Sequence, residues 1–501
     1  MTFLNDMLKF HRSVFFIAII FYCFTAYYSN GYYHADEHYQ IIEFAGAKLG
    51  TNTANEQAWE FKAMSRQAIQ PAIVYVVFRV LDVFQISDPY TKAFILRLLS
   101  AILALAVIQF FVKTMLAEID DRFRKPFILI SYFLWFLPAI NVRFSSESWS
   151  GLMFLLAISI IYSKNLNQKN MFLVLGGILG LAFLFRFQSV FLSLGLLGWL
   201  LFVRKISLKN MIHLLLSGIA VLIFGILIDS WFYGKFVITF WEYFNKQIIE
   251  DIASEFGIEI WYYYLKEIIK APFWPIGVIT AFAFLMLLIK APRNILIWCI
   301  VPFLIVHSII PHKEVRFLLP LANLVPSILV LGLHKVECNR IMKRFNRISK
   351  TVVLVFAMML FIVNSIGLVA FSFKPSGNGK MEISRYIADE FDDKPVRLIH
   401  CSWSSPYNPF ESVPTKFYQR DNVEDIRILT LCQLNDSLLS DSKENLLVLR
   451  QIELKNPKCL MNLQQLGFVE RKRSIPVRIE KLCRFYPEMK PEEVLILYSI
   501  P

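Results

Sequence analysis

The chain has 501 residues, of which 56% are hydrophobic and 18% are charged. Soluble domains carry about 25% charged residues, so this composition excludes an ordinary soluble enzyme and indicates a polytopic α-helical membrane protein. The formal charge of +13 does not indicate a nucleic-acid partner, because the basic residues stand in short loops between apolar runs, as expected for a membrane protein.

Apolar runs of membrane-spanning length recur over the first three quarters of the chain. The first has no small-residue cleavage site after it, so we interpret it as a retained helix. About eleven spans are predicted. They lie at 14–30, 90–117, 126–140, 149–163, 171–185, 189–203, 211–228, 273–290, 294–310, 317–334 and 351–372.

A charged stretch, YYHADEHYQI at 32–41, follows directly on the first span. Asp36 could cap the helix that follows, but a cap leaves Glu37 and the histidines unexplained. His34 and His38 have zincin-like spacing, but the acid is misplaced for that motif and no later cluster supplies a third ligand. Ion coupling in a transporter would place such groups nearer the middle of the membrane.

The fourth interpretation of this stretch is general-base catalysis at the membrane surface. A carboxylate there can take a proton from a sugar hydroxyl as the hydroxyl attacks an activated carbon. A second acid, next to the first, can orient the acceptor or stabilise positive charge in an oxocarbenium-like transition state. Asp36 and Glu37 are therefore the candidate catalytic residues, with His34 beside them.

The apolar stretch at 68–84 would reverse the side of every later basic loop if it were counted as a span. We therefore interpret it as an interfacial or re-entrant helix on the outer side. With a cytoplasmic N-terminus, the short basic loops lie inside and the C-terminus lies outside. The predicted outer loops are residues 31–89, 141–148, 229–272 and 311–317.

Further polar residues at these outer positions are candidates for substrate binding. Arg186 interrupts an apolar stretch, where it would either contact a carboxylate or substrate or mark a break between two helices. Asp229 ends a span and would either contact the sugar donor or cap a helix. Salt bridges at the surface are the alternative role for Glu60, Arg66 and Arg143.

The fourth outer loop, PHKEVRF, places His312, Lys313 and Arg316 around Glu314. Arginine and lysine are the donors that a lipid phosphate needs. An anchor that binds lipid headgroups without chemistry is the alternative. We predict that this cationic loop and the acids of the first loop meet across one pocket outside the bilayer.

Residues 373–501 form a predicted soluble tail. PVRLIHCSW and NLLVLRQIEL have the composition of strands in a small α/β domain. An even number of cysteines on an oxidising side permits disulfides, and unpaired thiols are the alternative. The four tail cysteines are Cys401, Cys432, Cys459 and Cys483.

Two motifs resemble the glycosyltransferase family 22 mannosyltransferases. HADEHYQIIEFA (34–45) resembles their first-loop motif, with Ala35 in place of proline, and PHKEVRFLLP (311–320) matches their histidine-lysine-glutamate-x-arginine-phenylalanine signature. HCSWSSPYNP (400–409) is similar to a motif of the GPI third-mannose transferase branch. Residues 59–71, 143–148 and 228–248 resemble further segments of the family 22 mannosyltransferases more weakly.

The resemblance implies a GT-C glycosyltransferase fold, with a catalytic membrane domain at 1–372 and a small α/β domain at 373–501. It implies inverting transfer of mannose from a polyprenyl- or dolichyl-phosphate donor to a glycan or glycolipid acceptor. Asp36 would be the base, Glu37 its neighbour, and His312, Lys313 and Arg316 would bind the donor phosphate, while Glu314 would contact the substrate.

The expected protein is a multi-pass enzyme of the ER membrane or the bacterial inner membrane, with its active site on the luminal or periplasmic side. We expect no cofactor and no metal, because lysine and arginine can stabilise the leaving phosphate. A lipid-linked sugar transporter or flippase, a transferase of another lipid-phosphate sugar, and a non-catalytic membrane subunit are the alternatives.

Overall fold

The computed structural model describes residues 2–163, 167–336, 347–401, 403–408, 413–486 and 490–500. The chain forms two compact units. The helical unit comprises Met1–Thr25, Met64–Gln70 and Leu98–Val369, and the mixed unit comprises Ala26–Ala63, Pro71–Arg97 and Ala370–Pro501. The C-terminal residues therefore belong to the same unit as most of the first loop.

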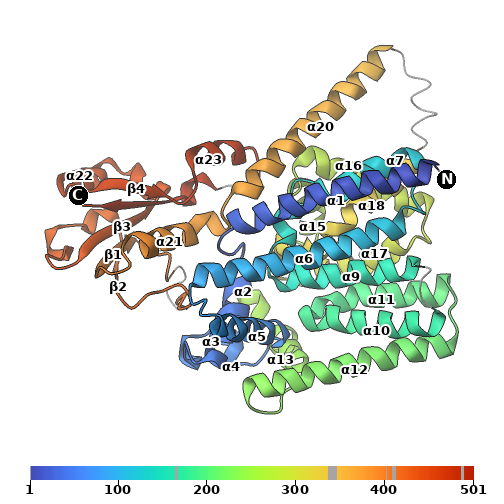
Figure 1. Cartoon of the computed structure of the whole chain (residues 1–501), viewed down its shortest axis with the longest axis horizontal. Coiled ribbons are helices and arrows are strands. Elements are labelled where there is room, and N and C mark those ends of the chain that lie inside the picture. The colour runs from blue at the N-terminus through green and yellow to red at the C-terminus, as the bar shows by residue number, and fades with distance from the viewer. Residues whose placement is uncertain are drawn as a thin grey trace. The chain divides into compact units, whose positions relative to one another are not determined.

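The helical unit is built almost entirely from helices (Figure 1). Those wholly or mainly within it are α1 (Thr2–Tyr28), α6 (Pro89–Met115), α7 (Asp121–Phe133), α8 (Leu137–Asn141), α9 (Ser146–Tyr162), α10 (Gln168–Phe185), η3 (Phe187–Ser189), α11 (Val190–Gly198), η4 (Trp199–Val203), α12 (Leu208–Tyr233), α13 (Thr239–Phe244), η5 (Asn245–Ile249), α14 (Ile252–Glu255), α15 (Tyr263–Lys270), α16 (Trp274–Lys290), α17 (Ile295–Ile309), η6 (Val315–Leu324), α18 (Val325–His334) and α20 (Arg347–Phe373).

Each predicted span coincides with one or two of these helices. Over the described residues, six helices are long and apolar enough to cross a membrane, or up to seven if the pair α16 and α17, bent by 115°, is one span. Two shorter apolar helices lie at Ser146–Tyr162 and Phe187–Val203. The helical membrane fold is confirmed, whereas the predicted number of about eleven spans is not.

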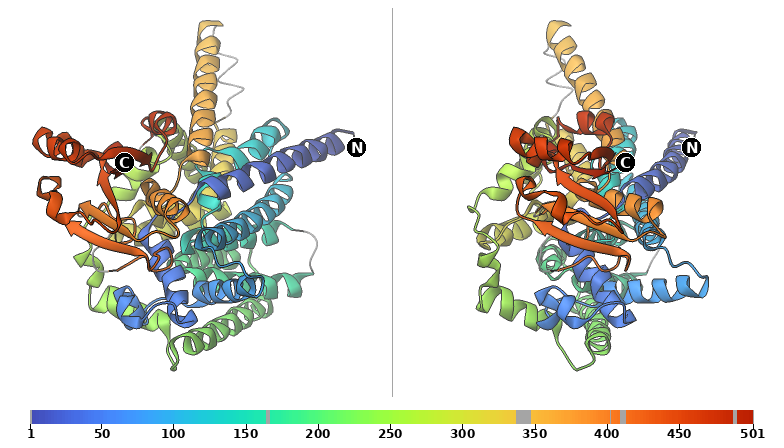
Figure 2. Two further views of the ribbon diagram at one scale, coloured as in Figure 1. Left: turned by 60° about the vertical axis from the view of Figure 1, so that its left-hand side comes forward. Right: turned by 90° about the vertical axis from the view of Figure 1, so that its left-hand side faces the viewer.

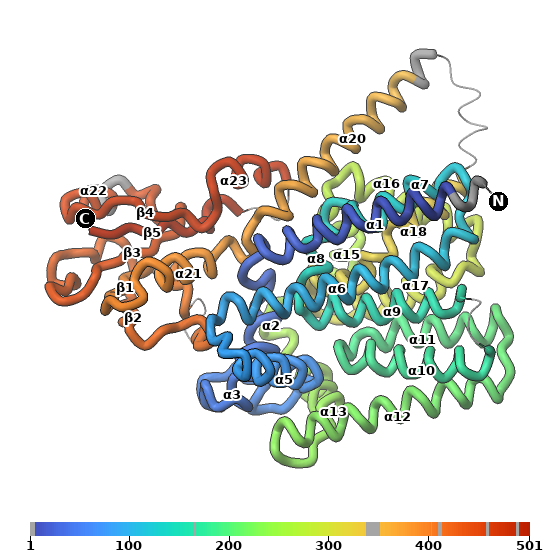
Figure 3. The backbone as a smooth tube through the Cα atoms, in the orientation of Figure 1, coloured from blue at the N-terminus to red at the C-terminus, as the bar shows by residue number. Residues whose placement is uncertain are grey.

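Close approach between helices depends on glycine at several contacts, of which two serve as examples. A Cβ atom on Gly176 of α10 would lie 2.0 Å from the carbonyl oxygen of Leu214 in α12, and one on Gly195 of α11 would lie 2.2 Å from that of Trp298 in α17. Helices in lipid associate through such close packing, because lipid tails are as apolar as the side chains. Figure 3 shows α10, α11 and α12 running beside one another.

The mixed unit begins with the short helices of the first loop and ends with a five-stranded sheet. Its helices are α2 (Ala35–His38), η1 (Tyr39–Glu43), α3 (Phe44–Leu49), η2 (Ala54–Glu56), α4 (Trp59–Lys62), most of α5 (Ile69–Val83), η7 (Gly377–Gly379), α21 (Lys380–Glu390), η8 (Leu431–Gln433), η9 (Asp436–Leu438), η10 (Gln451–Lys455), α22 (Pro457–Gln465), α23 (Val477–Cys483) and η11 (Pro491–Glu493). The helix α5, predicted to be interfacial or re-entrant, has 15 residues and is not among the candidate spans.

The strands are β1 (Val396–Cys401), β2 (Val423–Ile428), β3 (Glu444–Arg450), β4 (Val469–Arg473) and β5 (Leu495–Ser499). Their order is β2-β1-β3-β5-β4, parallel across the first three and antiparallel across the last three (Figure 2). The two predicted strands correspond to β1 and β3, so the small α/β part of the fold is confirmed. Residues 402 and 409 of the HCSWSSPYNP stretch lie outside the described residues.

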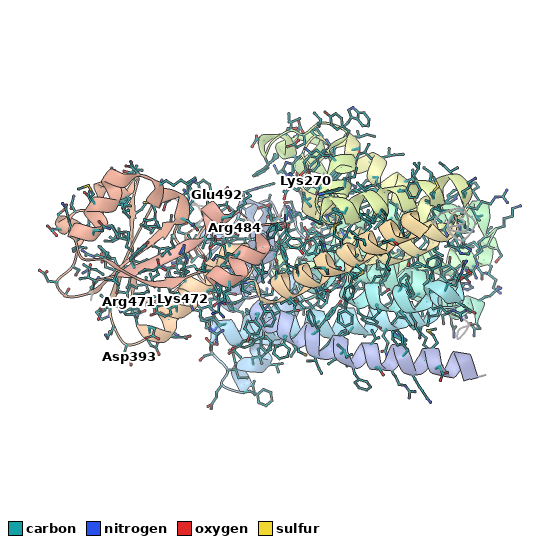
Figure 4. The ribbon with its side chains drawn as sticks, turned by 90° about the horizontal axis from the view of Figure 1, so that it is seen from above. Lys270, Asp393, Arg471, Lys472, Arg484 and Glu492 are labelled. Carbon is teal, nitrogen blue, oxygen red and sulfur yellow. The ribbon has the colours of Figure 1, made fainter. Side chains whose placement is uncertain are left out.

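Both faces of the sheet are buried, because successive residues of a strand point to opposite faces. In β3, Leu446 packs in a core with Ile383 and Ile387 of α21, whereas Leu447 packs on the other face with Leu463 of α22. This explains why the central strands β3 and β5 carry continuous apolar runs rather than alternating ones. The edge strand β4 consists mostly of charged residues. Two of them, Arg471 and Lys472, are labelled in Figure 4.

The tail cysteines divide between the two predicted alternatives. Cys432 is disulfide-bonded, whereas Cys401 and Cys483 are buried free thiols. The side chain of Cys459 is not among those described. Burial raises the pKa of Cys401 to about 12, so this thiol is un-ionised at neutral pH and behaves as a small apolar side chain.

Candidate functional site

One candidate group is acidic and lies on α2, in the mixed unit. His34 caps this four-residue helix, since its Nδ1 accepts a hydrogen bond of 3.3 Å from the backbone N–H of Asp36. Glu37 turns back on the chain and accepts a hydrogen bond of 2.9 Å from the N–H of Tyr33. The cap and this return contact hold a helix that is too short to be stable by itself.

The two acids of this group differ in exposure. The side chain of Asp36 is 25% exposed and lies 3.7 Å from His34 Nδ1, whereas Glu37 is buried. Asp36 can therefore be reached by a substrate hydroxyl, and Glu37 is better placed to fix the helix. The sequence alone could not separate these two roles.

Glu60 is tied to the segment that follows α2. Gln40, in η1, donates a hydrogen bond of 2.8 Å from Nε2 to Oε1 of Glu60 on α4. Glu60 is buried, so the surface salt bridge considered for it is wrong. The structure thus groups His34, Asp36 and Glu37 on and beside α2, and it ties Glu60 to η1, the segment that follows α2.

The other candidate group is cationic and lies in the helical unit, around the loop between α17 and η6. Lys313 Nζ donates to the backbone oxygens of Glu259 at 2.8 Å and Pro311 at 3.3 Å. His312 Nδ1 lies 3.1 Å from the backbone oxygen of Gly257. Both residues therefore tie this loop to the middle of the segment 229–272, and burial lowers the pKa of Lys313.

Arg316 and Arg186 share carboxylates within this group. Arg316 holds Glu314 with two hydrogen bonds, from Nε at 2.6 Å and Nη2 at 2.9 Å. Its Nη1 lies 3.5 Å from Oε1 of Glu147, and Arg186 Nη1 donates to the same oxygen at 2.7 Å. Arg186 also stands at the end of α10, so both roles considered for it, helix break and carboxylate contact, are found.

Glu147 is a member of this group that the sequence reasoning missed. It stands in the first turn of α9, one position before Ser148, whose N–H is capped by Ser145. An acid in the first turn is typical of a helix N-terminus, so its sequence context gives no sign that it joins two arginines from distant segments. The one indication in the sequence was the stretch RFSSES (143–148), which contains Glu147 and resembles a segment of the same mannosyltransferase family.

An aromatic ring and a carboxylate make further contacts with the basic side chains of the cationic group. The ring of Phe317 lies 5.0 Å from the guanidinium carbon of Arg186 and 5.3 Å from that of Arg316, close enough for cation–π attraction. Nε2 of His312 lies 2.9 Å from Oε1 of Glu314. This hydrogen bond raises the pKa of His312, because it stabilises the imidazolium. Lys313 differs from the two arginines, because it donates to backbone oxygens and the carboxylate of Glu259 acts on its charge.

Three other predicted residues lie apart in the chain and have local roles in the helical unit. Asp229 accepts hydrogen bonds from Ala68 N–H at 2.7 Å and Thr239 Oγ1 at 2.6 Å, so it anchors the segment 64–70 and the start of α13. The guanidinium of Arg66 lies 5.4 Å from the ring centroid of Tyr243. Arg143 is buried just before α9.

Comparisons with known proteins give one family match and several structural likenesses. Residues 13–394 match the Alg9-like mannosyltransferase family, and no curated protein matches. Crystal structures of ArnT from Cupriavidus metallidurans bound to undecaprenyl phosphate (12% identity, TM-score 0.49, 97% of each chain) and of the Archaeoglobus fulgidus oligosaccharyltransferase with zinc and sulfate (12% identity, TM-score 0.47, 90% of this chain and 69% of that one) are similar. A structure of archaeal AglB from Archaeoglobus fulgidus, with an inhibitory peptide and a dolichol-phosphate, has 11% identity and a TM-score of 0.47 over 92% of this chain and 72% of that one.

Proposed function

This chain belongs to the Alg9-like mannosyltransferase family, as its first-loop and PHKEVRF motifs predicted, and on this premise we propose that it transfers mannose from a polyprenyl- or dolichyl-phosphate donor. The acceptor is a glycan or glycolipid, and transfer proceeds with inversion at the anomeric carbon. The observation that supports a lipid-phosphate donor is the cationic group, which gathers four basic side chains, two of them arginines, around the loop 311–317 in an apolar, helical protein.

Asp36 is the general base of this proposal. As the acceptor oxygen forms its bond to the anomeric carbon, the bond from that carbon to the phosphate oxygen breaks, and the phosphate leaves with the electron pair. The proton of the acceptor hydroxyl passes to the Asp36 carboxylate. A carboxylate that is partly exposed suits this role, because the base must come within hydrogen-bond reach of the hydroxyl.

The cationic group stabilises the leaving phosphate. Arg316 and Arg186 offer planar guanidinium groups, which suit phosphate oxygens, and Glu314 and Glu147 hold them in place. Donors that are already oriented stabilise charge as it develops without further reorganisation. We place both groups on the luminal or periplasmic side, because the short basic loops then lie in the cytoplasm.

The proposed function is tested by offering the purified protein, in lipid vesicles, a radiolabelled polyprenyl-phosphate mannose with a membrane glycolipid extract as acceptor. We expect labelled mannose in the glycolipid fraction, and none when GDP-mannose replaces the lipid donor. A transporter or flippase would instead move the donor across the vesicle membrane without forming a new glycosidic bond. Label that stays entirely in the donor would reject the proposal.

Donor binding is expected to weaken as the pH rises. The raised pKa of His312 means that its positive charge is fully present below the ordinary histidine range and is lost as the pH rises through the raised value. Loss of one charge-assisted contact to the phosphate would raise KM for the donor roughly tenfold between about pH 6 and 9. The measurement is KM for the donor against pH; in His312→Gln the rise should disappear, and a flat wild-type profile would contradict the assignment.

A further inference from the structure

A histidine–carboxylate pair lies fully buried just after the acidic group. Only 1% of the side chain of His38 and 2% of that of Glu43 is exposed, and Nε2 of His38 lies 2.8 Å from Oε1 of Glu43. The imidazole is stacked between the rings of Tyr32, at 5.2 Å, and Tyr418, at 5.3 Å. Two aromatic faces and a hydrogen bond therefore hold His38 in a single orientation.

The backbone after α2 makes this pair possible. His38 and Glu43 are five residues apart, a spacing that an α-helix does not bring onto one face. The segment η1, from Tyr39 to Glu43, is a π-helix, in which hydrogen bonds join residues five apart. This wider turn brings Glu43 to His38, immediately beyond Asp36.

Glu43 also joins the first loop to the C-terminal part of the mixed unit. Its Oε1 accepts a hydrogen bond of 3.1 Å from the N–H of Phe417, and its Oε2 accepts one of 2.8 Å from Asn52 Nδ2. The ring of Phe417 stacks on that of Phe78 in α5, with centroids 5.3 Å apart and planes inclined by 10°. The segment 415–418 is therefore fixed to the first loop by both backbone and side-chain contacts.

We propose that His38 and Glu43 are positioning residues for Asp36, and that the C-terminal segment 415–418 completes the first-loop site. This inference rests on the proposed role of Asp36 as the base. The helix α2 has four residues, too few to fix its own orientation, and His38 is its last residue. Removing the tie to Glu43 lets α2 move, and a misplacement of about 1 Å can cost about a hundredfold in rate.

The test compares Glu43→Gln, His38→Asn and the double variant with wild type in the donor-transfer assay. Glu43→Gln keeps the shape of the side chain but removes its charge and replaces one acceptor oxygen by an NH₂ group. In one orientation this group faces the donor Asn52 Nδ2, and in the other it faces the N–H of Phe417 and Nε2 of His38. We expect kcat to fall by about ten- to a hundredfold, with KM for polyprenyl-phosphate mannose unchanged. Because the two residues act as one unit, the double variant should be no slower than the slower single variant.

Two matched controls separate positioning from stability. Tyr90→Phe removes a buried hydrogen bond of 2.6 Å to Ser384, and Lys394→Gln removes an exposed contact of 3.0 Å to Glu444, within the same unit. Neither residue is on α2, so kcat should be unchanged even where the melting temperature falls. Loss of kcat that follows the melting temperature across all variants would show a merely structural role and overturn the proposal.

The failure of this inference can be told apart from failure of the proposed function. If Asp36→Asn abolishes transfer but Glu43→Gln and His38→Asn keep wild-type kcat, only the positioning role is rejected. If Asp36→Asn itself transfers mannose at the wild-type rate, Asp36 is not the base, and the His38–Glu43 pair has nothing to position.

Discussion

Replacing Asp36 with asparagine is expected to reduce kcat for mannosyl transfer by about a thousandfold, within the range of 10²–10⁴ that a general base contributes. Asparagine has nearly the same shape but cannot accept the proton of the acceptor hydroxyl at neutral pH. The cap of α2 uses the backbone N–H of Asp36 and the side chain of His34, so it survives the substitution. The measurement is initial-rate transfer of label at saturating donor.

The matched control for this prediction is Asp88→Asn. Asp88 lies in the same unit and accepts hydrogen bonds from the N–H and Oγ1 of Thr91, at 2.8 and 2.6 Å, a capping role that asparagine also fills. Both variants should have wild-type melting temperatures. An Asp36→Asn enzyme that keeps more than about a tenth of wild-type kcat would be incompatible with general-base catalysis by this residue.

Glu37→Gln should have the milder effect of the two adjacent acids. Its carboxylate is buried and already accepts a hydrogen bond from the N–H of Tyr33, which the amide oxygen of glutamine can also accept. Sequence reasoning could find both acids, because charge at a membrane boundary is unusual. It could not rank them, because the ranking depends on how the backbone turns before α2.

A tertiary contact that depends on a π-helix, a rare form of secondary structure, could not be predicted from the sequence. The spacing of His38 and Glu43 fits neither the period of an α-helix nor that of a strand, and becomes meaningful only with the π-helix η1. Glu147 was missed for a related reason, since its partners Arg186 and Arg316 come from separate segments. Local pattern carries no information about which distant segments meet.

The fold itself was more predictable where apolar patterning is long and regular. Helices lie at every predicted span, and β1 and β3 lie where apolar runs predicted strands. Short spans were the weak point, because helices such as α9, with 17 residues, can cross a membrane only with help from neighbouring protein. The grouping of the first loop with the C-terminal residues also depends on long-range contacts, including that between Glu43 and Phe417.

The second large effect is expected for Arg316→Lys, which keeps the positive charge but loses the planar fork of donors. Arg316 is held in plane by two hydrogen bonds to Glu314, which fixes the direction of the guanidinium. Lysine can replace the charge but not this geometry. We expect kcat/KM for the lipid donor to fall by about ten- to a hundredfold, the loss of one charge-assisted hydrogen bond of about 1.5–3 kcal/mol.

Arg124→Lys is the control for this substitution, because Arg124 also pairs with a carboxylate, at 2.6 Å from Asp121, but does so on the surface of α7. It should leave kcat/KM unchanged. The distinction matters because a headgroup anchor at 311–317 would bind anionic lipid equally well through lysine, as a point charge. Wild-type kcat/KM in Arg316→Lys would favour that anchor, whereas a selective loss ties the guanidinium of Arg316 to the phosphate that leaves during transfer.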